Sequence, residues 1–548
     1  MKRRVLATLG AVILSSALTA PVRAQDAAPT TPEIERLKAQ LAAQQEQIDQ
    51  LRRVLDEQKK VLDDASKPRV PSLGEVASTS AVIPAGDVAP VLHPGLAAAL
   101  SPQQVPADQA VAPLQLKIGA ATITPVGFMD LTEVFRSADG GSGIGTNFGS
   151  TPYNNVSTGL GNLSESRFSA QNSRIGARID ALVHGTKVLA YWESDFLGTQ
   201  STNASVTSNS NSFRMRLYFI DLKKGKWEIL GGQSWSMLTP GRVGISPLPS
   251  DIFYSQNMDT NYQVGLAWTR APQFRAVYHP SDTVTFGLAL ETAEQYGGGS
   301  SGGGAIVLPT NLATPYTNTQ VDLGASTFTV PNLMPDIQAK LAFDPKVNGN
   351  LMHIEFAGFL SEFKTYDPLT YTSFRKTGGG GEANFNLELL KGFHLIVNTF
   401  ISDGGGRYLF GQAPDMIVTG FGAPSPLHAD STLDGFEYTT HNTMFFAYYG
   451  GDYIGKDVSL DPSNKYAFIG YGYPKSANSQ NRTIQEATFG INQTFWKNPT
   501  YGALSFIFQY SYLFRDPWYV ASGAPRSTHN DMVWVDLRYT LPGQAPKY

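Results

Sequence analysis

Cysteine is absent from this sequence of 548 residues, and charged side chains are scarce. Without cysteine the chain forms no disulfide, no thiolate metal site and no cysteine nucleophile, and it is suited to crossing an oxidising compartment unfolded. Charged residues make up 16% of the chain, against about a quarter in soluble domains. The net charge of −4 gives no reason to expect nucleic acid as a partner.

Long apolar runs are missing as well. No stretch beyond the N-terminus offers the roughly 18 consecutive apolar residues that indicate a transmembrane helix. A closed β-barrel is the other structure that can span a bilayer, because its backbone hydrogen bonds are all made between strands. The sequence is rich in residues that suit a barrel, with 53 glycines, 30 phenylalanines and 24 tyrosines.

A secretory signal peptide is predicted at residues 1–24. Basic residues precede an apolar run from Val5 to Ala20, and small residues lead to a cleavage site after Ala24. The run is shorter than the roughly 20 residues that a spanning helix needs. A proline follows it directly, which argues against the alternative of a helical anchor.

Residues 25–66 carry the clearest helical period, a heptad repeat. Its apolar seam consists of Ile34, Leu37, Leu41, Ile48, Leu51, Leu55 and Leu62. Such a narrow stripe favours self-association into a coiled coil, the alternative being a single helix that folds back on its own barrel. Gln44 and Gln58 add polar layers, and the mixed Ile and Leu leave two, three or four helices open.

Residues 67–113 are rich in proline and alanine and predict a semi-extended linker. Residues 114–548 then show strand-length alternation, clearest where Leu504, Phe506, Phe508, Tyr510, Tyr512 and Phe514 share one face. The fold class is therefore all-β, a transmembrane antiparallel barrel preceded by a helical coiled coil. At about 25 residues per strand, the region holds about 16 to 18 strands, enough for an aqueous lumen.

The predicted connections differ at the two ends of the barrel. Short turns such as Lys223–Lys226 lie at one end, and long loops are expected at Gly297–Pro331 and Ala413–Thr439. The glycine run Gly378–Gly381 is read as a flexible loop or turn, since no Gly-Lys-Ser/Thr follows to bind phosphate. This asymmetry is typical of outer-membrane barrels, whereas a soluble sandwich would have short loops at both ends.

Alternation in successive strands places charged side chains on the inner face. The predicted lumen residues are Arg167, Arg174, Arg178, Arg214, Arg216 and Arg275, together with Glu193 and Asp195. A one-residue slip in strand phase would turn Arg167 outward. On the same rule Tyr218 points inward, while Leu217 and Phe219 point outward.

Arginines beside carboxylates would create a transverse field that selects anions. The alternative is that each arginine only neutralises a neighbouring carboxylate and stiffens the wall. The segment Ser236–Tyr262 could fold into the lumen as a constriction, or lie over the mouth of the barrel, and the sequence does not decide between the two. No nucleophile and base, no metal-ligand spacing and no cofactor motif is recognised, so we expect neither an enzyme nor a bound cofactor or metal.

The barrel region resembles the DcaP-like trimeric porins of Gram-negative outer membranes. The segments that carry the resemblance are Gly127–Asp130, Ser166–Gly176, Glu193–Phe196, Gly232–Trp235, Ala271–Arg275 and Ser402–Tyr408. The resemblance implies a homotrimer of 16-stranded barrels, a periplasmic trimeric coil and a basic constriction that passes small anions, dicarboxylates among them. The tail Pro542–Tyr548 departs from the family, which usually ends on an aromatic residue.

The expected function is passive diffusion of small hydrophilic solutes through an outer-membrane porin that favours anions. The expected partners are other copies of the chain, outer-membrane lipid and lipopolysaccharide, and small anionic solutes, but no nucleic acid. One alternative is a phosphate- or polyphosphate-selective porin. Another is a structural tether that binds the cell wall through its coil, with the coil in the periplasm and the barrel as anchor.

Overall fold

The computed structural model describes residue 45 and residues 114–140, 142–153, 159–198, 211–299, 302–324 and 330–542. The predicted signal peptide, the linker and all seven apolar residues of the predicted heptad seam lie outside the described residues. The described strands belong to one unit, Ala89–Tyr548.

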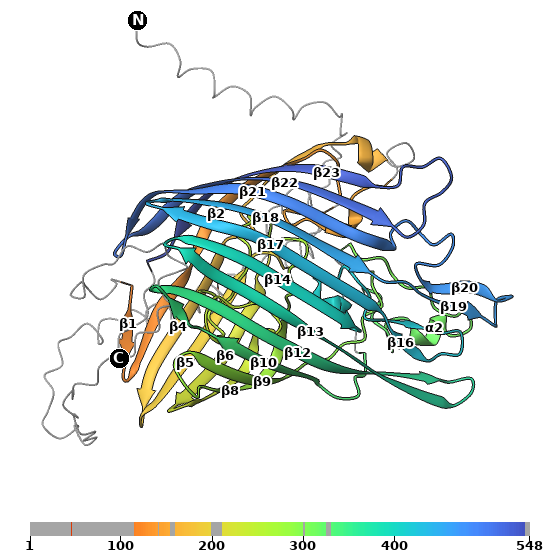
Figure 1. The fold of residues 1–548 in the computed structure, drawn as a ribbon, viewed down its shortest axis with the longest axis horizontal. Helices are drawn as coiled ribbons and strands as arrows, with labels where there is room; N and C mark the ends of the chain where they lie inside the picture. Colours follow the sequence, from red (N-terminus) through yellow and green to blue (C-terminus); the bar gives the residue numbers. More distant parts are fainter. Residues whose placement is uncertain are drawn as a thin grey trace, which may run out of the picture. The chain divides into compact units, whose positions relative to one another are not determined.

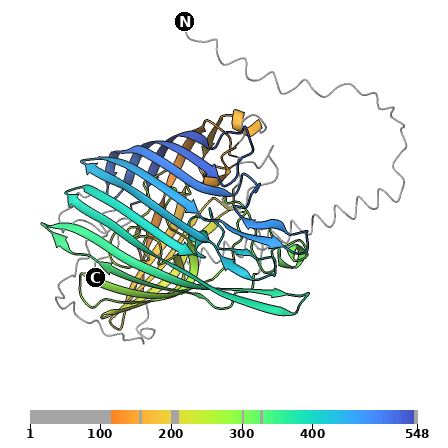
Figure 2. The ribbon, with the colours of Figure 1, turned by 45° about the vertical axis from the view of Figure 1, so that its right-hand side comes forward.

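Neighbouring strands of this unit run antiparallel and close into a barrel (Figures 1 and 2). The wall contains 16 strands among the described residues. They are β2 Ala121–Arg136, β4 Arg174–Val183, β5 Thr186–Asp195, β6 Arg214–Lys224, β7 Trp227–Trp235, β8 Arg270–Tyr278, β9 Val284–Glu291, β10 Asp336–Phe343, β12 Asn350–Asp367, β13 Thr372–Leu390, β14 Phe393–Asp403, β17 His428–Thr440, β18 Thr443–Ile454, β21 Asn481–Asn498, β22 Gly502–Pro517 and β23 Thr528–Thr540. The last strand pairs with the first, with Trp534 opposite Val134, so the predicted closed barrel is confirmed.

Shorter elements extend the wall or lie in the loops. They are β1 Leu116–Ile118, β3 Glu165–Ser169, β11 Lys346–Val347, β15 Met416–Val418, β16 Pro424–Pro426, β19 Asp457–Asp461, β20 Ala467–Tyr471, α2 Ala313–Tyr316 and the 3₁₀ turns η2 Phe148–Ser150, η3 Gly159–Asn162 and η4 Gly406–Tyr408. In the part of the chain that the structure describes, no helix is long and apolar enough to cross a membrane.

The two ends of the barrel differ as predicted. At the short-turn end, two-residue connections such as 184–185 and 441–442 join neighbouring strands. At the long-loop end, residues 292–335 and 404–427 carry α2, β15 and β16, which extend to the right of the barrel in Figure 1. The outer face is largely apolar, with Met129 and Phe274 63% and 72% exposed. Such an outward apolar band is what a lipid bilayer covers.

Two expected loops are strands. The predicted loop Ala413–Thr439 ends in β17, which pairs with β14 and β18 over its length. The run Gly378–Gly381 lies inside β13 and not in a turn. A side chain at Gly380 would come 2.4 Å from the carbonyl oxygen of Ile401 on β14. Glycine is therefore used here for close packing in the wall.

The predicted phase of β6 is wrong beyond Arg216. Ser194 of β5 pairs with Met215 and the next residue, Glu193, pairs with Leu217, so Arg216 is an extra residue that forms a β-bulge. The bulge reverses the faces of the following residues. Leu217 is buried, whereas Tyr218 is 60% exposed on the outer face.

Candidate functional site inside the barrel

The connection between β7 and β8, residues 236–269, is folded into the barrel, and we call it the lumen loop. Arg242, in the first part of this loop, makes a bidentate ion pair of 2.8 and 2.9 Å with Glu437 on the inner face of β17. In the order of strands round the wall, β8, β9, β10, β12, β13 and β14 lie between β7 and β17. The segment Ser236–Tyr262 therefore reaches the opposite wall, and the surface-loop alternative is wrong.

Main-chain N–H groups of the lumen loop donate to polar side chains of the wall. The donors and acceptors are Met237 to Glu291 at 2.9 Å, Gly241 to Glu355 at 3.1 Å, Gly244 to Asp344 at 3.0 Å, Met258 to Gln509 at 2.7 Å and Val264 to Glu486 at 3.1 Å. Hydrogen bonds to charged acceptors are stronger than neutral ones. Because the acceptors belong to β9, β12, β21, β22 and the turn after β10, the loop is held from several sides.

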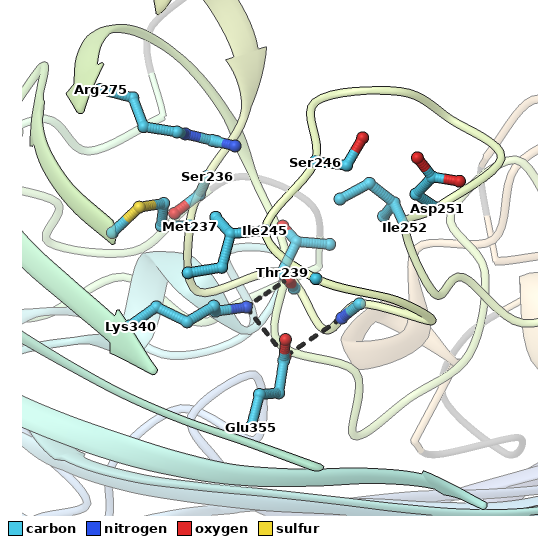
Figure 3. A pocket seen from close by; sticks show the side chains of 12 residues that line it. Ser236, Met237, Thr239, Ile245, Ser246, Asp251, Ile252, Arg275, Lys340 and Glu355 are labelled. Carbon is cyan, nitrogen blue, oxygen red and sulfur yellow. Dashed lines mark hydrogen bonds and ion pairs between the residues drawn. The ribbon is translucent and has the colours of Figure 1, made fainter. Parts of the chain in front are cut away.

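Glu355 on β12 is the best-connected of these acceptors. It is buried, and its carboxylate receives Gly241 N–H of the loop, Lys340 Nζ of β10 at 2.8 Å and Asn384 Nδ2 of β13 at 3.0 Å. Lys340 Nζ also donates to the carbonyl of Thr239 at 2.9 Å, as Figure 3 shows. One ion pair therefore binds both the N–H and the C=O side of the same loop turn.

Close backbone contact fixes the end of the lumen loop on the opposite wall. A side chain at Gly450 of β18 would come 1.8 Å from the carbonyl oxygen of Val264, and one at Gly265 would come 1.9 Å from that of Thr432. Gly265 also has a φ of 91°, which L side chains rarely adopt. Glycine is needed at both positions for the loop to lie against β17 and β18.

Asp259 ties the lumen loop to the loop after β2. Its carboxylate accepts the main-chain N–H of Thr146 at 3.2 Å and that of Asn261 at 2.9 Å. The group is 1% exposed. Burial raises the pKa of Asp259 to about 6, although the Arg136 guanidinium and these hydrogen bonds act in the opposite direction.

The structure brings most of the predicted lumen residues together. Arg216 donates to Glu193 at 2.7 Å and to Asp195 at 2.9 Å, and Arg214 also bonds Asp195, at 2.7 Å. Arg174 lies 3.9 Å from Glu193. These five residues come from β4, β5 and β6, and the structure places them side by side.

Arg270 belongs to the same cluster and was not predicted. Its guanidinium lies over the rings of Trp235, at 5.4 Å, and Trp268, at 5.7 Å. Arg216 lies over Trp235 as well, at 5.9 Å. No carboxylate among the described residues forms an ion pair with Arg270, and its Nη1 is buried without a hydrogen-bond partner. Arg270 begins β8, where it lies opposite Trp235 of β7, and Trp268 beside it belongs to the lumen loop.

We call Arg174, Arg214, Arg216 and Arg270, with Glu193 and Asp195, the arginine cluster. Four guanidinium groups face two carboxylates there, which leaves two positive charges in excess. Arg538 of β23 lies beside the cluster, because Arg538 and Arg174 stack on the same ring of Phe128 at 4.2 and 5.1 Å. Arg538 is itself paired with two carboxylates, Asp130 and Asp536.

The remaining predicted lumen residues lie elsewhere. Arg178 is on the inner face of β4 and forms a bidentate pair with Asp180 at 2.8 Å. Arg275 is buried behind Trp235 and donates to its carbonyl oxygen at 2.6 Å. Arg167 is opposite the inward-facing Val134 but is 45% exposed near the long-loop end, where it pairs with Glu165. Arg275 and Arg167 therefore lie outside the cluster.

Water reaches some of the arginines on the inner face of β4, β6 and β23, which we call the arginine wall. The side chains of Arg214, Arg538 and Arg178 are 37%, 21% and 15% exposed. Tyr262 of the lumen loop accepts a hydrogen bond from Arg216 at 3.1 Å, and the ring of Tyr254 packs beside those of Tyr262 and Trp235. Burial raises the pKa of Asp251. The lumen loop therefore contacts the arginine cluster directly.

Comparison with known proteins gives a fold and no close relative. Neither a family model nor a curated protein matches the chain. The crystal structure of the outer membrane channel DcaP of Acinetobacter baumannii matches with a TM-score of 0.54 at 17% identity, covering 78% of this chain and 99% of that one. OprB of Pseudomonas putida and OmpF of Salmonella typhi each give a TM-score of 0.41 at 11% identity; they cover 76% and 78% of this chain and 94% and 100% of their own. The DcaP match confirms, at the level of the fold, the resemblance seen in the sequence.

Proposed function

We propose that this barrel lies in the outer membrane of a Gram-negative-type bacterium and lets small hydrophilic solutes diffuse through its lumen, past the arginines that water reaches. The observation that carries the proposal is the set of inward-facing arginines that water still reaches, with Arg214 37% exposed. A structural barrel whose interior was packed only for stability would bury its charged groups in neutral pairs. The apolar outer band supports the location.

Anions are the favoured solutes in this proposal. The arginine cluster has two more guanidinium groups than carboxylates, and Arg270 has no carboxylate partner among the described residues. Guanidinium groups bind carboxylates in a planar, bidentate geometry, so small mono- and dicarboxylates fit this wall. The fold it shares with the DcaP channel is consistent with transport.

The test is the zero-current potential in a planar bilayer under a tenfold KCl gradient. A fully anion-selective pore would approach about 59 mV in magnitude. Arg214→Gln with Arg270→Gln removes the two excess charges, and we expect the potential to move towards zero. Lys187→Gln with Lys224→Gln, at the exposed short-turn end, removes the same charge outside the cluster and should leave the potential unchanged.

The outcomes separate the rival functions. Equal potentials in both double variants would refute an arginine-based selection. If the wild type forms no stepwise conductance, the porin proposal fails and the tether becomes the leading function. Added succinate and added phosphate at equal charge concentration separate the remaining pair, because a phosphate-selective porin would be blocked by phosphate at lower concentration.

We also propose that the chain assembles as a homotrimer with its coiled coil in the periplasm. The heptad seam from Ile34 to Leu62 supports self-association, and the resemblance to the DcaP-like porins supports three copies. Deletion of residues 25–66 should lower the mass of the complex in detergent, or weaken it on dilution, while single-channel conductance stays the same. A coil-deleted protein with lost conductance would contradict a purely assembling role.

A further inference from the structure

The outer face of β17 and its neighbouring strands carries a polar region at the height of the apolar band. On β17 the inward residues include Leu433, which is fully buried, and Glu437, which binds Arg242 of the lumen loop. The alternating residues Asp430, Thr432 and Asp434 therefore point outward. Asp434 lies six residues before the end of β17 at Thr440, near the middle of the strand.

Strands β22 and β23 are apolar at this position. On β22, Leu504 through Phe514 present only apolar and aromatic side chains to the outside, every second residue. On β23 the corresponding residues are Val533, Val535 and Leu537. A carboxylate facing lipid near the middle of the band is unfavourable, because lipid offers it no hydrogen-bond donor. Among the described residues, no lysine, arginine or histidine forms an ion pair with Asp434.

The polar region continues on the neighbouring strands, and we call it the outward polar patch. It consists of Thr399, Asp430, Thr432, Asp434, Tyr449 and Gln485 on β14, β17, β18 and β21. Within it, Thr432 Oγ1 donates to Asp434 at 2.9 Å, and the Tyr449 hydroxyl donates to Gln485. The patch therefore holds hydroxyl and amide donors as well as carboxylate acceptors.

Small residues separate these polar groups. Gly451 lies opposite Thr432, and Ala487 lies opposite Tyr449, which itself lies opposite Asp434. Ala447 follows on β18, opposite Phe436. Inside a bilayer, protein surfaces associate where small residues allow the backbones to approach and polar side chains bond across the contact. Both features coincide here.

We infer that the outward polar patch is the surface by which one copy of this barrel contacts another. A second copy fits because the patch has donors and acceptors of its own, and because the heptad repeat of the same chain also predicts self-association. The inference rests on the proposal that the barrel spans a membrane and assembles. It adds the surface, which neither the heptads nor the barrel fold specifies.

The test uses the full-length protein extracted in mild detergent, with mass photometry as the readout. Ala447→Trp places a bulky side chain in the patch, and we expect the concentration for half dissociation to rise by at least tenfold. Ala276→Trp, on the apolar outer face of β8, is the matched control and should assemble as the wild type does. Equal assembly of both variants, or equal loss in both, overturns the inference.

Two further variants protect the test from misfolding. Asp434→Leu should weaken assembly, whereas a lipid-facing Asp434 would give a barrel of raised thermal stability and unchanged mass. Because the chain contains no cysteine, Thr432→Cys gives a single reactive thiol. A short thiol cross-linker should then join two copies of the Thr432→Cys variant in native membranes. If Ala276→Cys forms a cross-linked dimer and Thr432→Cys does not, the assignment is overturned. A monomeric wild type that conducts would refute the contact and leave the channel proposal standing.

Discussion

The ion pair between Arg242 and Glu437 should determine how firmly the lumen loop is seated. Both side chains are largely buried, at 13% and 4% exposed, and Glu437 also accepts the Tyr448 hydroxyl at 2.7 Å. Glu437→Gln removes the negative charge and leaves the guanidinium uncompensated inside the barrel. Loss of one partner of a buried pair costs about 3–5 kcal/mol. For a chain of this length that is a fall in midpoint of about 3–5 °C.

The measurement combines thermal unfolding with single-channel recording. We expect Glu437→Gln to lower the midpoint of thermal unfolding. It should also add rapid current fluctuations, because Arg242 of the lumen loop is released from β17. Arg242→Met combined with Glu437→Met removes both charges and should recover most of the lost stability, since apolar residues of similar volume replace buried pairs at little cost. The fluctuations should persist in the double variant, because the bidentate contact is still absent.

A matched ion pair outside the lumen serves as the control. Arg482 and Asp516 pair near the long-loop end with side chains 46% and 18% exposed. Asp516→Asn should cost less than about 1 kcal/mol, as exposed pairs usually do. The reasoning fails if Glu437→Gln behaves like Asp516→Asn in both assays, or if the double methionine variant is as unstable as Glu437→Gln.

Three further predictions concern other contacts of the wall. Gly450→Ala should unseat the lumen loop and raise current noise, because the new methyl group would lie 1.8 Å from the carbonyl oxygen of Val264. Gly451→Ala is the control and should resemble the wild type in the same recordings, because its nearest neighbour is the flexible side chain of Gln485 at 3.3 Å. Burial holds the pKa of Asp259 at about 6, above its value of 3.8 in the unfolded chain. The carboxyl group therefore does not lower the free energy of unfolding below about pH 4, where it is protonated in both states, but lowers it by up to about 3 kcal/mol above pH 6. Asp259→Asn should therefore raise the thermal midpoint at pH 7 but not at pH 4, and an equal change at both pH values would contradict the assignment. Tyr218→Arg should destabilise the barrel by about 2–4 kcal/mol as a lipid-facing charge; full tolerance in thermal unfolding would mean that the residue faces the lumen and that the bulge is absent.

Strand phase was predictable where the two faces differ sharply in polarity. The shared outer face of Leu504, Phe506, Phe508, Tyr510, Tyr512 and Phe514 on β22 follows from alternation alone and agrees with the structure. The phase of β6 could not be predicted, because a bulge is an extra residue relative to the neighbouring strand, here β5, and leaves no mark in the sequence of β6 itself. The error affected only the residues after Arg216.

Other errors come from residues that are chosen for contacts with distant parts of the chain. Gly378–Gly381 resembles a loop in composition, since glycine is disfavoured in strands, but in the wall it makes room for Phe363 and the β14 backbone. Nearly all of β17 was missed because its outward residues include Asp430 and Asp434 where an apolar pattern was expected. Arg270 was missed because strict alternation along β8 from the inward Arg275 would turn it to the outer face.

The contacts of the lumen loop also set an order of events during folding. Its N–H groups bond partners far ahead in the sequence: Gly241 and Glu355 are 114 residues apart, Val264 and Glu486 are 222 apart, and Met258 and Gln509 are 251 apart. A half-built barrel therefore cannot satisfy the loop. Such long-range contacts form late, and an unpaired amide in an apolar environment is costly. The loop is therefore fully seated only after β21 and β22 have formed, so the interior of the barrel is completed late, when the wall is nearly complete.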